Sequence, residues 1–147
     1  MNKIFLVLLF VLTSCGYQPI YLNKNLENIE YSKIDLKGDE RINKKIISTL
    51  PISENEQNQN QIFLISSYNV EPASKNSSGQ IISYRTIIKV NLEIRDVNNK
   101  TNKKKGFVKR SVYNNKQNNF ELVDYQDTIK NDLINIIIGE IIIFLNS

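Results

Sequence analysis

Residues 82 to 94 alternate in polarity, and this run restricts the fold of the chain more than any other feature. The odd positions from Ser83 to Arg95 are polar except for Ile87. The even positions are mostly apolar: Ile82, Tyr84, Thr86, Ile88, Val90, Leu92 and Ile94. Because successive side chains of a β-strand point to opposite faces, the pattern predicts a long strand with one buried and one solvated face. Such a strand is typical of an antiparallel sheet.

The flanking segments predict neighbouring strands. Residues 98–106 (NNKTNKKKG) predict a hairpin turn that ends in glycine, and 107–113 (FVKRSVY) predict the returning strand. On the other side, 62–70 (IFLISSYNV) predict a strand and 71–80 (EPASKNSSGQ) a loop. Residues 53–61 (SENEQNQNQ) predict a polar connector.

A short strand and a helix are predicted before this connector. Residues 29–36 (IEYSKIDL) predict the strand, although its apolar phase shifts near the middle. Asp39 is a good helix N-cap, because its carboxylate can accept a hydrogen bond from a free backbone N–H. The helix ends before Pro51, and its apolar stripe is Ile42, Ile46 and Leu50, with Ile47 beside it.

The last predicted element is a C-terminal helix within residues 120–145. Its apolar face is Leu122, Tyr125, Ile129, Leu133, Ile136 and Ile137, and its polar face is Asp124, Asp127, Lys130 and Asn131. The stretch LINIIIGEIIIFL is apolar on nearly every side, but it is short for a membrane span. A core helix is the favoured interpretation of this stretch and an isoleucine-rich strand is the alternative. Its second apolar face requires a cover, either the sheet with the other helix or a partner protein.

These elements follow one another in the order β-α-β-β-β-α. The predicted fold class is α+β, with two helices packed on one face of a four-stranded, largely antiparallel sheet. We assign residues 28–147 to one domain of this kind. The chain without an expected 14-residue signal has 147 − 14 = 133 residues, enough for one domain with a core.

The chain begins with a short apolar run that ends near its only cysteine. Residues 4–12 are too few to cross a bilayer as a helix and fit the apolar region of a secretory signal. The tetrapeptide LTSC that follows resembles the bacterial lipobox. This resemblance implies a cleaved lipoprotein signal peptide at 1–14, lipidation of Cys15 and a lipidated tether at 15–27. A plain signal peptide with a chance cysteine is the alternative.

The expected lipidation would tie the domain to a membrane surface. Two or more acyl chains make a stable anchor, and the resemblance to bacterial lipoproteins implies three on Cys15. Gly16 follows the cysteine where an aspartate would favour retention at the inner membrane. By resemblance to lipoprotein sorting, we expect the protein on the periplasmic side of the outer membrane.

Residue types that the chain lacks argue against several kinds of chemistry. The sequence has no histidine, which removes histidine-based acid–base catalysis, histidine-dependent nucleophiles and histidine-ligated metal sites. It also has no glycine-rich phosphate loop. We therefore expect no enzyme activity, cofactor or metal. The net charge of +4 falls to +3 when Lys3 leaves with the signal, which is too mild to indicate nucleic-acid binding.

Four stretches, in this order, resemble the LPS-assembly lipoprotein LptE family. They are CGYQPIY (15–21), the long alternating strand with its return, SVYNN (111–115), and the final amphipathic segment that begins FELVDY. The chain departs from the family pattern at Ile20, where leucine is more frequent, and at Val112, which is inserted into a Ser-Tyr-Asn stretch. The last helix is also unusually rich in isoleucine.

The resemblance covers nearly all of the chain after the signal and implies a function without catalysis. Members sit at the outer membrane and fold inside the lumen of a large β-barrel, the LptD translocon, as a plug and assembly factor. The complex delivers lipopolysaccharide to the outer leaflet, and some members bind lipopolysaccharide directly. The alternative is a lipid-anchored periplasmic adaptor or structural lipoprotein of another envelope or secretion complex.

Two groups of side chains are candidates for these contacts. The polar face of the long strand is a candidate for partner contact through Arg85, Lys89, Asn91 and Arg95, with Glu93 among them, although an ordinary solvated face has the same pattern. Basic side chains at and near the predicted hairpin tip are candidates for the phosphates of lipid A, although a solubilising loop is the common role of such a run. They are Lys100, Lys103, Lys104, Lys105, Lys109 and Arg110.

Overall fold

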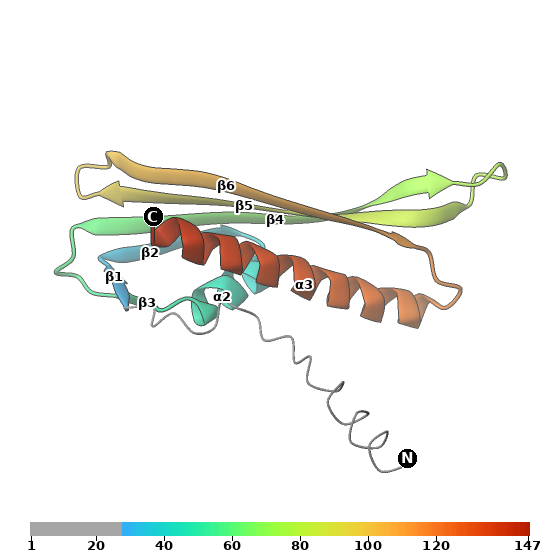
Figure 1. Cartoon of the computed structure of the whole chain (residues 1–147), viewed down its shortest axis with the longest axis horizontal. Helices are drawn as coiled ribbons and strands as arrows, with labels where there is room; N and C mark the ends of the chain where they lie inside the picture. The colour runs from blue at the N-terminus through green and yellow to red at the C-terminus, as the bar shows by residue number, and fades with distance from the viewer. Residues whose placement is uncertain (1–27) are drawn as a thin grey trace, which may run out of the picture.

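The computed structural model describes residues 28–147, so the expected signal peptide (1–14), Cys15 and the tether (15–27) lie outside the described residues. The elements in chain order are β1 (Ile29–Tyr31), β2 (Lys33–Gly38), α2 (Glu40–Thr49), β3 (Ile52–Glu54), β4 (Asn60–Lys75), β5 (Ile81–Asp96), β6 (Thr101–Asn114) and α3 (Asn119–Leu145). Figure 1 shows a sheet of long strands as one layer and both helices as a second layer on one side of it.

Four strands form the main sheet in the order β2-β4-β5-β6. β2 runs parallel to β4, whereas β4 with β5 and β5 with β6 are antiparallel pairs. The predicted α+β class, the element order and the helices on one face of a largely antiparallel sheet are therefore confirmed.

The strand predicted at 29–36 is two strands in different sheets. Ser32 separates them, and its backbone N–H and hydroxyl both donate to the carbonyl oxygen of Asn60, at 2.7 and 3.0 Å. β1 pairs in parallel with β3, and β2 pairs in parallel with β4. The shift in apolar phase within this segment thus marks a change of sheet.

The alternation at 82–94 matches burial over most of its length. The even residues Thr86, Ile88, Val90, Leu92 and Ile94 face the helices, and none is more than 8% exposed. Full burial of one such aliphatic side chain contributes roughly 1.5–3 kcal/mol. The prediction is wrong for Ile82, which is 49% exposed, and for its neighbour Ser83, which is buried. Ile82 lies near the β4–β5 hairpin, which extends past the start of α3 (Figure 1), so the helix layer does not cover it.

α2 begins as predicted, with Asp39 as its N-cap. The Asp39 Oδ1 accepts a hydrogen bond from the N–H of Ile42 at 2.9 Å. The helix ends before Pro51, as predicted. Gly38 precedes the cap with φ of +92°, and a Cβ atom there would lie 1.8 Å from the carbonyl oxygen of Ser66. Only glycine fits this close approach of β2, α2 and β4.

α3 is one continuous helix, so the alternative of a C-terminal strand is wrong. Its buried residues are Leu133, Ile134, Ile137, Ile138 and Ile141. Three positions differ from the predicted faces, and the first is Tyr125, which is 37% exposed. Ile136 is 50% exposed, because it lies about 100° around the helix from the buried Ile137. Lys130 points inward: its side chain is 12% exposed, and its Nζ lies 3.5 Å from Asp39 Oδ2 and 4.4 Å from the ring centre of Tyr68.

Between residues 28 and 147, no helix is both long enough and apolar enough to cross a membrane. The extra cover expected for the isoleucine-rich half of α3 comes partly from the sheet and from α2, since its buried residues belong to the main core cluster with Ile42 and Leu92.

Three predicted loops are shorter than expected, because the strands continue through polar residues. Residues 53 and 54 belong to β3, and β4 begins at Asn60. The loop predicted at 71–80 is strand up to Lys75. β6 begins at Thr101, so only the first part of 98–106 is turn. Backbone pairing with β1 keeps residues 53 and 54 extended, and pairing with β5 does the same for the polar ends of β4 and β6.

Candidate interaction surfaces

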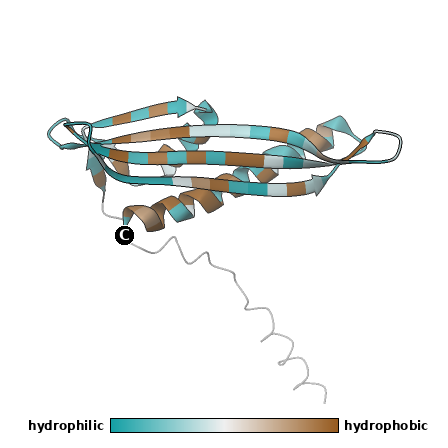
Figure 2. Cartoon of the chain, turned by 90° about the horizontal axis from the view of Figure 1, so that it is seen from above, coloured by the Kyte–Doolittle hydropathy of each residue, from teal (hydrophilic) through white to brown (hydrophobic). Residues whose placement is uncertain are grey.

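The face of the main sheet that points away from the helices, called the open face here, carries all four residues predicted for partner contact. Arg85, Lys89, Asn91 and Arg95 occupy odd positions of β5 and therefore point to this one side. Figure 2 looks onto the open face and shows hydrophilic and hydrophobic residues interspersed along the strands. The structure thus brings this predicted group together on a rigid scaffold.

Cross-strand pairs give the open face its mixed character. Ile65 lies opposite Asn91, and Lys89 lies opposite Val108. Ile65 is 48% exposed and Val108 is 44% exposed. Arg85 Nη1 lies 3.1 Å from Glu71 Oε1, and both side chains are 41% exposed. A partner would therefore meet individual half-exposed apolar side chains framed by charges.

One part of the open face is hollowed, with a volume of about 440 Å³. Asn91 and Gly106 face each other there, and a Cβ atom at Gly106 would lie 2.9 Å from the Asn91 Oδ1, so a side chain at this position would crowd the asparagine. The Arg95 guanidinium lies 4.3 Å from the ring centre of Phe63, a distance typical of a cation–π contact. The lining residues are Asp35, Lys37, Phe63, Ile65, Asn91, Glu93, Arg95 and Lys104.

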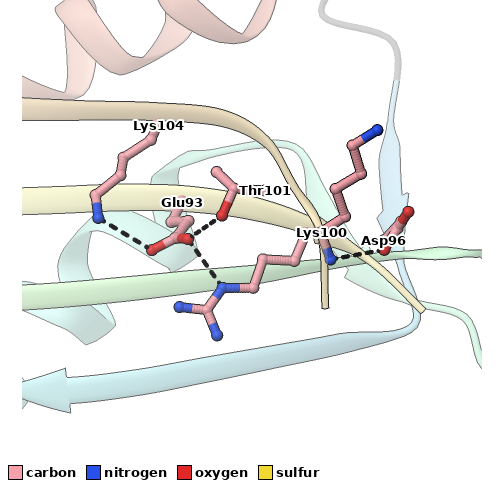
Figure 3. Close-up of polar contacts among 6 residues, drawn as sticks. Glu93, Asp96, Lys100, Thr101 and Lys104 are labelled. Carbon is pink, nitrogen blue, oxygen red and sulfur yellow. Dashed lines mark hydrogen bonds and ion pairs between the residues drawn. The ribbon is translucent and has the colours of Figure 1, made fainter. Parts of the chain in front are cut away.

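The Glu93 carboxylate contacts three polar side chains at this hollow. Its carboxylate accepts hydrogen bonds from Arg95 Nε at 2.9 Å and from the Thr101 hydroxyl, and Lys104 Nζ lies at 3.6 Å (Figure 3). The Arg95 hydrogen bond, followed by that of Thr101, lowers the pKa of Glu93 to about 2. The same contact raises the pKa of Arg95 above its ordinary value. Both groups therefore stay ionised across the physiological range, which preserves the hydrogen bond between them.

The six basic residues predicted for lipopolysaccharide contact do not form one cluster at the hairpin tip. The turn itself is held by Asp96, whose Oδ1 accepts hydrogen bonds from the N–H groups of Asn98 and Lys100 at 2.9 Å each. Lys100 lies in this turn. The other five basic residues lie on β6, and their side chains point to both faces of the sheet. Lys104 and Arg110 share the open face, whereas Lys103, Lys105 and Lys109 point to the side of α3.

Sequence reasoning missed the part of the hollow that comes from β2 and β4, namely Asp35, Lys37, Phe63 and Ile65. One sequence signal could have indicated it. In 62–70, Phe63 and Ile65 are apolar, although they point to the opposite side of the strand from the apolar Ile62 and Leu64. A strand that is apolar on both sides indicates a second contact surface. Pairing of β2 with β4 could not be read from the sequence, because this parallel pair is joined through α2 and β3.

The part of the chain that the structure describes contains no group of three or more aspartate, glutamate or cysteine side chains placed to hold a metal ion. The open face offers cations and anions, half-exposed apolar side chains and a shallow hollow.

Comparison with known proteins places this fold among bacterial lipoproteins. No protein-family model matches the sequence, and no curated protein sequence matches it. Solved structures do match. Rare lipoprotein B from Shewanella oneidensis has a TM-score of 0.53 at 13% identity, over 76% of this chain and 90% of that one. Lipoprotein B from Nitrosomonas europaea has a TM-score of 0.56 at 11% identity, over 85% of this chain and 88% of that one.

A lipoprotein from Caulobacter crescentus also matches, with a TM-score of 0.52 at 11% identity over 76% of this chain and 86% of that one. At these identities the likeness concerns the fold. The domain of this chain has the α+β fold of rare lipoprotein B, the LptE-like fold that the sequence motifs indicate.

Proposed function

We propose that this chain is a non-catalytic, lipid-anchored lipoprotein of the outer membrane that plugs and helps to assemble a large LptD-type β-barrel. In this role it takes part in the transport and insertion of lipopolysaccharide. The observation that carries the proposal is the open face, a charged and preorganised sheet surface on a fold shared with rare lipoprotein B.

The open face suits the inside of a large barrel. Barrel lumens are polar, so a plug must offer charged and polar groups without large apolar areas. Arg85 and Arg95 are each held by a carboxylate, at 3.1 and 2.9 Å, and sit on paired strands rather than on loops. Side chains that are already ordered lose less entropy on binding, which favours a specific complex.

Lipopolysaccharide contact is the second part of the proposal. Lys100 lies in the turn, and the other five basic residues would act as two groups, because Lys104 and Arg110 lie on the open face whereas Lys103, Lys105 and Lys109 lie beside α3. Phosphate groups of lipid A fit lysine as a point charge and arginine as a bidentate donor. Separate Glu substitutions of the two groups, followed by lipopolysaccharide binding at low salt, measure the share of each.

The experiment that tests the function is isolation of the native protein from membranes in mild detergent, with its companions identified by mass spectrometry. We expect a large outer-membrane barrel in near-equal amount. An adaptor of another envelope or secretion complex would instead bring other proteins of that complex and no barrel, and this outcome would refute the plug function.

A charge-reversed pair tests the surface itself. Arg85→Glu with Lys89→Glu on the open face should abolish recovery of the barrel without unfolding the domain. The matched control reverses two exposed charges on the helix layer, Arg41→Glu with Lys44→Glu, and should leave recovery unchanged. Equal loss in both variants would mean that the open face is not the contact.

A further inference from the structure

One long edge of the molecule combines lysines with half-exposed apolar side chains. β6 is the last strand of the sheet, and α3 lies beneath it. Lys103 and Lys105 Nζ lie 5.9 and 5.5 Å from the ring centre of Phe144 in α3. We call this edge the β6 flank; it consists of Lys103, Lys105, Lys109 and Lys116 with Tyr125, Ile136 and Ile143 of α3.

Further contacts continue the lysine row along the flank. Lys109 Nζ lies 2.5 Å from Glu140 Oε1, and Lys116 Nζ lies 4.7 Å from the ring centre of Tyr125. Lys103, Lys105 and Lys116 thus each lie over an aromatic ring. A cation–π contact leaves the ammonium N–H groups that face away from the ring free to donate to a phosphate.

The apolar part of the flank is a single stripe of α3. Ile136 and Ile143 are seven residues apart and Tyr125 is eleven residues before Ile136, spacings that return to nearly the same side of a helix. Ile136 is 50% exposed, Ile143 is 52% exposed and Tyr125 is 37% exposed. Glu140 lies one helical turn from both isoleucines and touches Lys109, which places the stripe directly beside the lysines. The exposed Asp132 is one turn before Ile136 and, with Glu140, offsets part of the positive charge.

The N-terminal chain joins the domain at one end of this flank. Asn28 lines a hollow of about 560 Å³ together with Lys103 of β6 and Leu145 of α3. Figure 1 shows β1, the turn between β5 and β6, and the C-terminus at this same end. From Cys15 to Asn28 the chain could extend at most roughly 45 Å, and the 27-residue α3 is roughly 40 Å long. A lipid on Cys15 would therefore leave the whole flank within reach of the bilayer surface.

We propose that the β6 flank docks on the headgroup region of an anionic phospholipid bilayer. The lysines contact lipid phosphates, while Ile136, Ile143 and the ring of Tyr125 enter the boundary between headgroups and acyl chains. Cationic and apolar groups on one face are the combination that binds such an interface. The aliphatic stems of the lysines can lie along the apolar stripe with their charges toward the headgroups. The docking rests on the lipid anchor of the proposed function and concerns the domain outside the barrel, while the open face is free.

A single tryptophan provides the test, because the chain contains none. The full-length lipidated protein carrying Ile143→Trp is reconstituted in phosphatidylcholine vesicles with brominated acyl chains, with and without phosphatidylglycerol. We expect strong quenching of tryptophan fluorescence only with phosphatidylglycerol, and loss of that quenching at high salt. A matched probe, Val108→Trp on the open side of β6, should not be quenched in either vesicle, since Val108 is 44% exposed but faces away from α3.

Charge reversal completes the test. Lys103→Glu with Lys105→Glu should reduce quenching of the Ile143→Trp probe to the level in pure phosphatidylcholine. Lys33→Glu with Lys37→Glu on β2, at the other edge of the sheet, makes the same change in net charge and should have no effect. Equal quenching in both vesicle types, or equal quenching of the two probes, would overturn the proposal. Quenching that needs lipopolysaccharide in the vesicles in place of phosphatidylglycerol would also overturn it, in favour of lipopolysaccharide binding by the flank.

Discussion

Adjacent residues of β5 lie in opposite environments, and the two faces of this strand have different tasks. Leu92 is fully buried under the helices, whereas its neighbours Asn91 and Glu93 line the hollow of the open face. Removal of apolar surface from water stabilises the covered face in a way that depends little on partners. Ion pairs at a half-exposed surface add little net stability. Substitutions on the open face should therefore affect partner binding more than folding.

The largest expected effect comes from comparing substitutions of the neighbouring residues Asn91 and Leu92. Leu92→Ala should destabilise the domain by about 2–5 kcal/mol, because it leaves a cavity in the core. Asn91→Ala should change stability by less than about 0.5 kcal/mol, as is usual for surface positions. Urea unfolding of the two variants measures both values. Similar losses would show that the open face also carries the stability of the fold.

The next test concerns the helix layer that creates the covered face. Asp39→Ala removes the N-cap of α2 and should lower stability by about 1–2 kcal/mol. Asp39→Asn keeps a capping oxygen, while both variants remove the ion pair with Lys130. Thermal unfolding should therefore rank Asp39→Asn between the wild type and Asp39→Ala. An equal loss in both would assign the effect to Lys130 rather than to the cap.

A pH experiment separates the contribution of the open face. Hydrogen bonds from Arg95 and Thr101 lower the pKa of Glu93 from 4.5 to about 2 in the folded protein. A lowered pKa means that the stabilisation is complete above the unfolded value and is lost as the pH falls through the folded value. The wild type should exceed Glu93→Gln in melting temperature by a constant amount above about pH 5, and the advantage should shrink between pH 4.5 and 2. A difference that does not vary with pH in this window would contradict the assignment.

The smallest effect is expected at Lys104. Its side chain is 65% exposed and its Nζ lies 3.6 Å from Glu93. Lys104→Ala should change stability by less than about 0.5 kcal/mol, because solvent screens such a pair. Urea unfolding at low and at high salt checks this value, and a clear loss at low salt alone would mean that the charge network of the hollow acts as a unit.

Local pattern made much of the fold predictable. The period of two in 82–94 and the cap at Asp39 depend on neighbouring residues. The cap is confirmed, and the period of two is confirmed from Thr86 to Ile94. The positions of Lys103 and Lys105 were missed, because an exposed lysine-rich segment has the composition of a loop. It is strand in the structure because Lys103, Lys104 and Lys105 pair with β5 across the hairpin.

The candidate surface was predictable on β5 alone. Arg85, Lys89, Asn91 and Arg95 follow from the alternation, but their neighbours Asp35 and Phe63 belong to strands whose pairing is not local in sequence. For the same reason Lys130, placed by helical period on a polar face, turns out to lie against Asp39 and Tyr68.

Periodicity and capping are properties of adjacent residues, and they predicted the long strands, both helices and the buried side of β5. They did not predict the division of 29–36 into two strands or the short strand β3. Which side chains share a surface became visible only in the packed fold. The hollow joins residues of β2, β4, β5 and β6, and the β6 flank joins lysines of one element to isoleucines of another. Such groupings depend on strand order, register and the rotation of α3, which are set when the whole core packs.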